Sequence, residues 1–225
     1  MATDTGFGIV RFFDDFQGDT LDANYWVATA NGGGTAPVHV STVNGVVVST
    51  LDTGDGDLCS LLGPDVWTPA TQGTIVFEAR VLLSTSLTQG VFIGFHDNES
   101  ETNVMPFDFN GGTYASTSSD GVGFLYDVEE GSDWYCVSVK ADSDGAQTDS
   151  LVAPVLDTWQ TFRITIELNG DIRYYINGKE ITESGAARTT AITTTTALGV
   201  AIAHLSSGVA GVVKVDYVYV SGGRV

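Results

Sequence analysis

Apolar and polar residues alternate with a period of two along much of this chain. In the clearest stretch Phe162, Ile164 and Ile166 fall on one face, and Arg163 and Thr165 fall on the other. Because side chains in a β-strand point alternately to opposite sides, this pattern is typical of a strand with one buried face.

Two Asn-Gly dipeptides follow this stretch. Asn169-Gly170 favours the positive φ angles of a type I′ hairpin turn, and the alternation restarts at residue 172. Asn177-Gly178 then leads into residues 179–181. We therefore predict a meander of three short strands between residues 160 and 181.

Runs rich in Val, Ile, Phe and Tyr recur elsewhere, and none has a sustained 3.6-residue apolar stripe. They cover residues 45–50, 73–82, 91–96, 121–127, 134–141, 198–204 and 212–220. Polar, turn-rich loops separate them at residues 51–57, 97–103, 109–120 and 142–150, and the Thr-rich tract 189–196 is predicted to be an extended edge or a loop. The spacing predicts an all-β sandwich or barrel with little helix.

The length of 225 residues suits one such domain. We expect an N-terminal arm over residues 1–10 and a single sandwich over residues 11–225. The first residues carry an acid where a signal peptide would carry a basic region, and no apolar run follows, so we expect synthesis in the cytoplasm without export.

Nine Lys and Arg residues against 28 Asp and Glu residues give a formal charge of −19. Such a surface repels phosphate backbones and anionic membranes, so neither nucleic acid nor a membrane is an expected partner. Copies of the chain repel one another as well. A homo-oligomer, which we expect, then needs apolar or backbone contacts, or a cation, to hold it together.

The only two cysteines, Cys59 and Cys136, each lie inside an apolar run. This placement favours two buried thiols, with a disulfide between them as the alternative.

Three segments resemble the concanavalin-like jelly-roll superfamily, which includes laminarinase-type glycoside hydrolases, legume lectins and laminin-G-like modules. They are FFDDFQGDTLDANYW (12–26), DTWQTFRITIELNGDIRYYINGKEI (157–181) and VKVDYVYV (213–220). The resemblance implies two stacked antiparallel sheets, one concave and one convex, with sugar sites in many relatives on the concave face. It also implies that the first and last strands are neighbours, which would place Phe12, Phe13 and Phe16 near Val215, Tyr217 and Tyr219.

A second set of segments resembles concanavalin-like virion proteins of tailed phages, which decorate capsids or sit on fibres. These are DGVGFLYD (120–127), WYCVSVKAD (134–142) and VDYVYVSGGR (215–224).

The laminarinase-type enzymes carry their catalytic carboxylates as E-x-D-x-x-E on one strand, and that pattern is absent here. The nearest substitute is Asp127 with Glu129, which would share one face of an extended strand and could act as an acid pair. The interpretation we favour is that these residues are solvent-exposed at the start of a loop. The three histidines stand alone, and no H-x-x-x-H, C-x-x-C or G-x-S-x-G motif occurs. We therefore expect no enzymatic activity.

Two places in the sequence are candidates for binding calcium. The Asp52, Asp55 and Asp57 loop lacks the spacing of an EF-hand. The family resemblance implies a structural calcium at Asp216 in the closing strand, assisted by a backbone carbonyl near Gly45. The alternative is that Asp216 pairs with a surface group or with water.

Among the tryptophans, Trp26 and Trp159 lie in segments predicted to form the core. Trp67, between Asp65 and Pro69, is the most loop-like and is the aromatic residue expected to contact a glycan.

The sequence thus favours a non-enzymatic virion structural protein, a capsid decoration or head-fibre subunit that binds the capsid or another virion protein. The alternatives are a carbohydrate-binding, lectin-like module of a receptor-binding fibre, and a degenerate glycoside hydrolase that uses Asp127 and Glu129.

Overall fold

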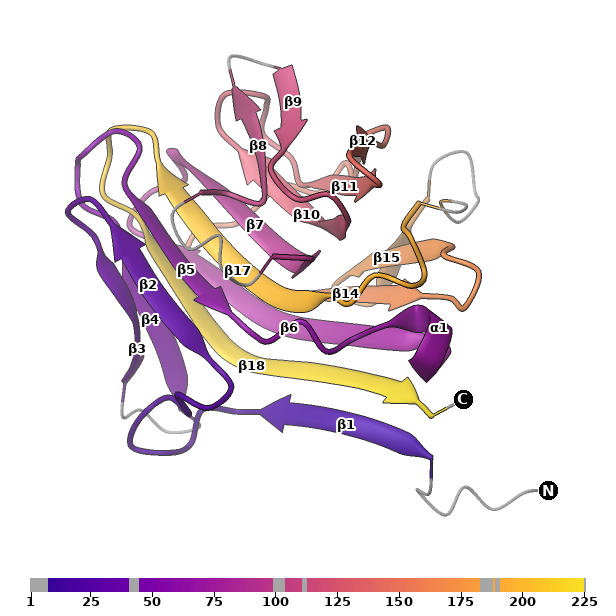
Figure 1. Ribbon diagram of the computed structural model, residues 1–225. Helices are drawn as coiled ribbons and strands as arrows, with labels where there is room; N and C mark the ends of the chain where they lie inside the picture. Colours follow the sequence, from indigo (N-terminus) through magenta and orange to yellow (C-terminus); the bar gives the residue numbers. More distant parts are fainter. Residues whose placement is uncertain are drawn as a thin grey trace.

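The protein folds into two antiparallel sheets packed face to face (Figure 1). The structure, a computed structural model, describes residues 8–40, 45–98, 104–110, 113–182, 188 and 191–224. This arrangement confirms the predicted all-β sandwich. In the described part of the chain, the helix α1 (Pro69–Gln72) has four residues, and no helix there is long and apolar enough to cross a membrane.

Sheet A has eight strands in the order β16-β15-β14-β6-β18-β4-β3, with β1 also paired to β18. Its strands are β1 (Ile9–Asp14), β3 (Thr35–Val40), β4 (Val46–Thr50), β6 (Ile75–Ser84), β14 (Gln160–Ile166), β15 (Ile172–Ile176), β16 (Lys179–Ile181) and β18 (Val212–Gly223).

Sheet B has eight strands in the order β12-β11-β10-β7-β17-β5-β2, with β13 also paired to β11. Its strands are β2 (Val27–Asn31), β5 (Leu58–Leu62), β7 (Gln89–His96), β10 (Gly121–Asp127), β11 (Tyr135–Lys140), β12 (Ser143–Asp144), β13 (Thr148–Asp149) and β17 (Gly199–Ser206). A separate hairpin consists of β8 (Phe107–Asn110) and β9 (Thr113–Ser116).

The first and last strands are neighbours, as the resemblance implied. Strand β1 pairs with β18 in a register that places Phe12 opposite Val220 and Phe13 opposite Tyr219. The sandwich begins at Ile9, so residues 9 and 10 belong to the sheet and not to the predicted arm. Residues 1–7 of that arm lie outside the described residues.

The two Asn-Gly turns differ in geometry. Asn177 and Gly178 have φ angles of 52° and 77°, the pair of positive values that a type I′ turn requires. At the first turn only Gly170 is positive, at 84°, and its N–H donates to the carbonyl of Glu167. The hairpin was predicted correctly there, but the type I′ turn was wrong. A type I turn followed by a left-handed glycine closes this longer loop.

The main core lies between the sheets, and its largest members are aromatic. Trp134 packs on Phe162 with ring centroids 4.6 Å apart, and Phe77 packs on Phe95 at 5.3 Å. Cys136 lies in this core, and both cysteines are buried and free, so the thiol prediction is confirmed.

A second apolar core covers the outer face of sheet B. Phe92 of β7 stacks on Phe107 of β8 with ring centroids 4.8 Å apart, and Phe109 packs beside them. Gly94 and Gly123 face each other in the β7–β10 register. A Cβ on Gly94 would lie 2.2 Å from the carbonyl oxygen of Val122, so this glycine permits the close approach of the two strands. A Cβ on Gly123 would lie 2.3 Å from Cε2 of Phe92, so the close approach requires glycine.

The substitution Gly123→Ala tests this second core. The added methyl group displaces the Phe92 ring, and we expect the free energy of unfolding to fall by about 1–3 kcal/mol. Gly18→Ala is the control, because a Cβ there meets its nearest atom at an ordinary 3.4 Å. Equal stability of both variants in urea titrations would contradict the packing described.

Candidate functional site

The concave face of the sandwich is occupied by protein. Strands β6 and β18 bend toward the side on which β8 and β9 lie, so the outer face of sheet B is the concave one (Figure 1). Met105, Phe107 and Phe109 are at most 4% exposed where they cover it. The described part of this face is therefore an apolar interface and offers no open trough to a polysaccharide there.

A small acidic cavity of about 210 Å³ remains at one end of this face. Asp127, at the end of β10, forms a side-chain hydrogen bond with Asp108 of β8. Asp55 and Glu129 also line the cavity. Asp127 is only 3% exposed, and burial, with the hydrogen bond and charge of Asp108, raises its pKa to about 7, although backbone N–H groups of Glu129 and Phe109 act in the opposite direction.

The partner of Asp127 is therefore Asp108 and not Glu129. The backbone N–H of Glu129 donates to Oδ1 of Asp127 over 2.8 Å, so Glu129 lies in a turn after the strand. This agrees with the interpretation that a loop begins here. The hydrogen bond and the charge of Asp108 favour the protonated form of Asp127. Direct hydrogen bonding between two carboxyl groups leaves no room for the sugar or water that lies between the carboxylates of glycosidases, which are ~5–5.5 Å or ~6.5–9.5 Å apart. Asp108 was missed because residues 104–108 were assigned to no strand and residues 109–120 were predicted to be a loop, whereas the structure has β8 there.

The tryptophan predictions were wrong for Trp67 and Trp159. Trp67 is 2% exposed within the main core, and its backbone pairs with Leu198. No face of its ring is open to a glycan. Trp159 precedes β14 on the outer side of sheet A, is partly exposed, and carries the guanidinium of Arg80 over its ring at 5.0 Å. Only Trp26 packs in the core as expected.

Asp216 lies at a bulge in β18, where the register with β6 shifts. Its Oδ2 accepts a hydrogen bond from Nη1 of Arg80 over 2.7 Å. Among the described residues, no cluster of three or more His, Cys, Asp or Glu side chains is arranged to hold a metal. A guanidinium at that distance repels a calcium ion, so these residues do not fit the implied calcium site and match the surface-pairing alternative.

The outer face of sheet A carries more than half of the chain's cations, and three of them are ion-paired with carboxylates on the same face. The pairs are Arg80 with Asp216, Arg163 with Glu78 and Arg173 with Glu180. The apolar neighbours of these residues point inward, so the following five of the nine Lys and Arg side chains point outward. They are Arg11, Arg80, Arg163, Arg173 and Lys214.

Aromatic rings alternate with these cations on what we call the cationic face. Besides the Arg80–Trp159 pair, Arg163 lies 5.9 Å from the ring centroid of Tyr175. The hydroxyl of Tyr217 donates to Oε1 of Glu78 over 2.7 Å. The result is a polar and aromatic surface across β15, β14, β6 and β18.

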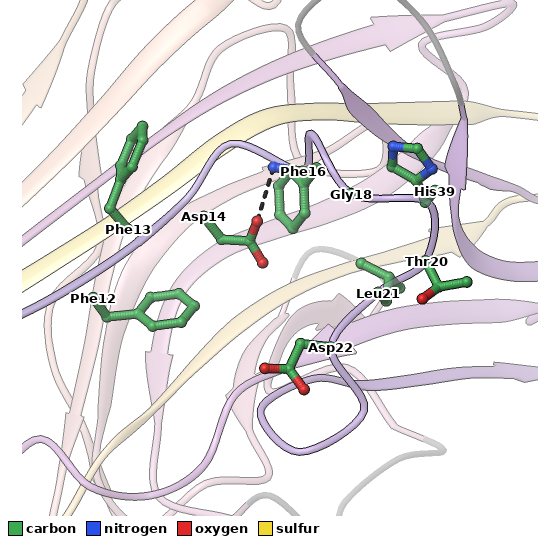
Figure 2. Close-up of a pocket in the computed structure, with 9 residues that line it drawn as sticks. All are labelled: Phe12, Phe13, Asp14, Phe16, Gly18, Thr20, Leu21, Asp22 and His39. Atoms are coloured by element: carbon green, nitrogen blue, oxygen red, sulfur yellow. Dashed lines mark hydrogen bonds between the residues drawn. The ribbon is translucent and has the colours of Figure 1, made fainter.

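A groove opens at the edge of sheet A between the end of β1, the following loop and β3. Its cavity measures about 330 Å³ and is lined by Phe12, Phe13, Asp14, Phe16, Gly18, Thr20, Leu21, Asp22 and His39. Figure 2 shows Phe12 and Phe13 at one end, Thr20 and His39 at the other, and Asp14, Phe16 and Asp22 between them. A second cavity of about 300 Å³ adjoins it and shares Thr20, Leu21 and His39.

Local hydrogen bonds fix the walls of this groove. The two oxygens of Asp14 accept from the N–H of Phe16 and from Nε1 of Trp26, each over 2.8 Å. Oδ1 of Asp22 accepts from the backbone and the side-chain nitrogens of Asn24, both over 2.9 Å. These contacts explain part of the FFDDFQGDTLDANYW segment: its acids order the loop that forms the groove.

No family model matches the sequence, and no curated protein matches it either. Solved structures do match in fold. Cellulose induced protein, Cip1, has a TM-score of 0.62 at 19% identity over 95% of this chain and 98% of that one. The carbohydrate recognition domain of Emp47p gives 0.61 at 12% identity over 99% and 100%.

The β-glucanase of Bacillus licheniformis has a TM-score of 0.59 at 12% identity, covering 93% of this chain and 96% of the enzyme. Identities this low show the fold alone. The architecture shared by these structures is the concanavalin-like jelly roll, as the sequence resemblance implied.

The Asp108–Asp127 pair predicts an unusual pH dependence. An acid whose pKa is raised on folding stabilises the fold at low pH and loses that contribution as the pH rises from about 4 through about 7. Asp127→Asn keeps a neutral partner for Asp108, so above pH 7 we expect this variant to be more stable than the native chain by about 1–3 kcal/mol.

Thermal melts from pH 5 to 9 measure this effect, and the difference between the two proteins should grow with pH. Glu129→Gln is the matched control, and it should not change the pH dependence. A native chain whose stability does not decline relative to Asp127→Asn between pH 5 and 8 would refute the raised pKa of Asp127.

Proposed function

We propose that this chain, which has the concanavalin-like jelly-roll fold, is a non-enzymatic virion structural protein: a capsid decoration or head-fibre subunit. The observation that carries the non-enzymatic role is the β8–β9 hairpin, whose aromatic side chains cover the described part of the concave face. We therefore expect this chain to meet its partner elsewhere.

The virion role rests on the segments that resemble phage virion proteins. These segments form β10, β11 and the last part of β18. Two of the three therefore belong to the sheet that the hairpin covers. The fold neighbours are compatible with a second role in glycan binding.

We place the attachment surface on the cationic face. Tyr, Trp and Arg are the residues most enriched at binding hot spots, because they combine large apolar area with hydrogen-bond donors. Three of the five cations on this face are already paired with carboxylates, so we expect the aromatic rings and the hydrogen-bond donors, more than net charge, to recognise the partner. A neighbouring copy of the chain that meets the same surface would form the expected homo-oligomer. On a repeating shell, many weak contacts of this kind add up to stable attachment.

The degenerate glycosidase receives less support from the geometry. Asp127 is buried against Asp108, and its cavity of about 210 Å³ is small for a sugar chain. We propose that this acid pair fastens the hairpin to the sheet.

Truncating Trp159 tests the attachment surface. Trp159→Ala removes the ring beneath Arg80, and we expect at least a ~10-fold loss of affinity for purified particles, measured by co-sedimentation. Val209→Ala, on an exposed loop residue between β17 and β18, is the control. Full occupancy of particles by the Trp159 variant, with its fold intact by circular dichroism, would contradict this placement.

Removing residues 1–7 tests the N-terminal arm. The sandwich begins at Ile9, so the deletion leaves the β1–β18 pairing in place and should not change the melting temperature. If the arm reaches a neighbouring subunit, occupancy on particles should fall by about tenfold. Unchanged occupancy of the shortened protein would rule out a role for the arm in attachment.

A further inference from the structure

We infer that residues 151–156 are a docking surface for a protein that presents Lys and Arg side chains around an apolar pocket. We call this segment, which lies between β13 and β14, the apolar ridge. It belongs to none of the strands that form the cationic face. The contact is therefore separate from the attachment proposed there.

The apolar ridge exposes a run of apolar side chains that the fold does not bury. Its sequence is LVAPVL. Leu151 is 82% exposed, Val155 is 51% exposed and Leu156 is 39% exposed. Consecutive exposed apolar residues favour aggregation, so a folded chain retains them where they make a contact. The ridge is the kind of surface that a protein partner covers.

Hydrogen bonds hold the tip of the ridge in one conformation. The backbone N–H of Leu151 donates to Oδ1 of Asp149 over 2.8 Å. The backbone N–H of Val152 donates to the hydroxyl of Ser150 over 3.1 Å. Trp134 fixes the turn from the other side, because its N–H donates to the carbonyl of Val152 and its carbonyl accepts from the N–H of Ser150. A turn that is already ordered loses little conformational entropy on binding, so it can present Leu151 to a pocket of the partner.

The charges beside the ridge define the partner. Residues 148–158 and the neighbouring residues 129–135 contain no Lys or Arg, and their acids are Glu129, Glu130, Asp133, Asp149 and Asp157. The two segments are neighbours because β13 pairs with β11 and places Asp149 opposite Tyr135. An acidic rim favours a partner with Lys and Arg around its apolar contact. It disfavours a second copy of this chain, because two ridges in contact would bring two acidic rims together.

The probe is a short synthetic peptide of alternating leucine and lysine, titrated against the full chain by fluorescence anisotropy. We expect saturable binding that weakens as salt is added. Two matched peptides, one with glutamate in place of lysine and one with serine in place of leucine, should bind at least about tenfold more weakly. Absence of binding at millimolar concentration overturns the inference, and so does equal binding of the peptide that lacks leucine.

Leucine variants locate the binding. Leu151→Ser and Leu156→Ser should each weaken binding of the leucine–lysine peptide about tenfold or more. Leu168→Ser is the matched control, because Leu168 is 53% exposed in the turn after β14. All three side chains are exposed, so the variants should fold. Peptide binding that survives both ridge substitutions overturns the assignment to the ridge.

A charge variant tests the acidic rim. Asp157→Asn keeps a side-chain oxygen for the hydroxyl of Ser84 and removes one charge, so peptide binding should weaken about threefold. Asp19→Asn removes one charge from an exposed position in the loop after β1 and is the control. Equal effects of the two substitutions would show that only net charge matters and would overturn the role of the rim.

Analytical ultracentrifugation tests whether a second copy covers the ridge instead. We expect Leu151→Ser to leave the oligomeric state of the chain unchanged at low and at high salt. An oligomer that this substitution dissociates, and that becomes tighter as salt screens the acidic rims, would identify the occupant as a second copy and overturn the inference.

Discussion

Burial of sheet B on both faces is the constraint from which the rest of the structure follows. Its inner face packs against sheet A, and its outer face packs against the β8–β9 hairpin through Phe92 and Phe107. A sheet covered on both sides is as apolar as a core strand in an α/β protein. Removing the hairpin would expose a contiguous apolar patch, so the hairpin contributes to the stability of the fold.

This double burial explains which elements the sequence predicted. Sheet A has one solvent-exposed face, so buried and exposed residues alternate along β14 and β15. The sequence therefore predicted both strands with nearly correct ends. Strand β5 reads LCSLL, buried at every position, and has no alternation to detect. The hairpin was missed for another reason: its Phe107-Asp108-Phe109 alternation is too short to stand out inside a turn-rich segment.

The candidate sites were harder to predict than the fold, because they depend on contacts between distant segments. The β8–β9 hairpin brings Asp108 to Asp127. Arg80 binds Asp216, which is 136 residues away in the sequence and lies at the bulge in β18. Trp67 looks like a loop residue in sequence, yet its backbone pairs with Leu198 and draws the ring into the core. The acids of residues 12–26 are different, because Asp14 and Asp22 accept hydrogen bonds from residues only two positions away. Local contacts of this kind can be expected from the sequence.

The electrostatic pattern divides the molecule into surfaces with different partners. Cations and their carboxylate partners share the outer face of sheet A, whereas carboxylates line the groove beside β1 and the cavity at the end of β10. The proposed attachment through the outer face of sheet A does not require the concave face to open.

Amide hydrogen exchange across the hairpin tests that closed face most directly. If β8 and β9 are packed as part of the core, the amides of Phe107 and Phe109 should exchange nearly as slowly as those of β7, with and without added oligosaccharide. Rapid exchange of the hairpin amides while β7 stays protected would show a concave face that opens to solvent. That result would contradict the account.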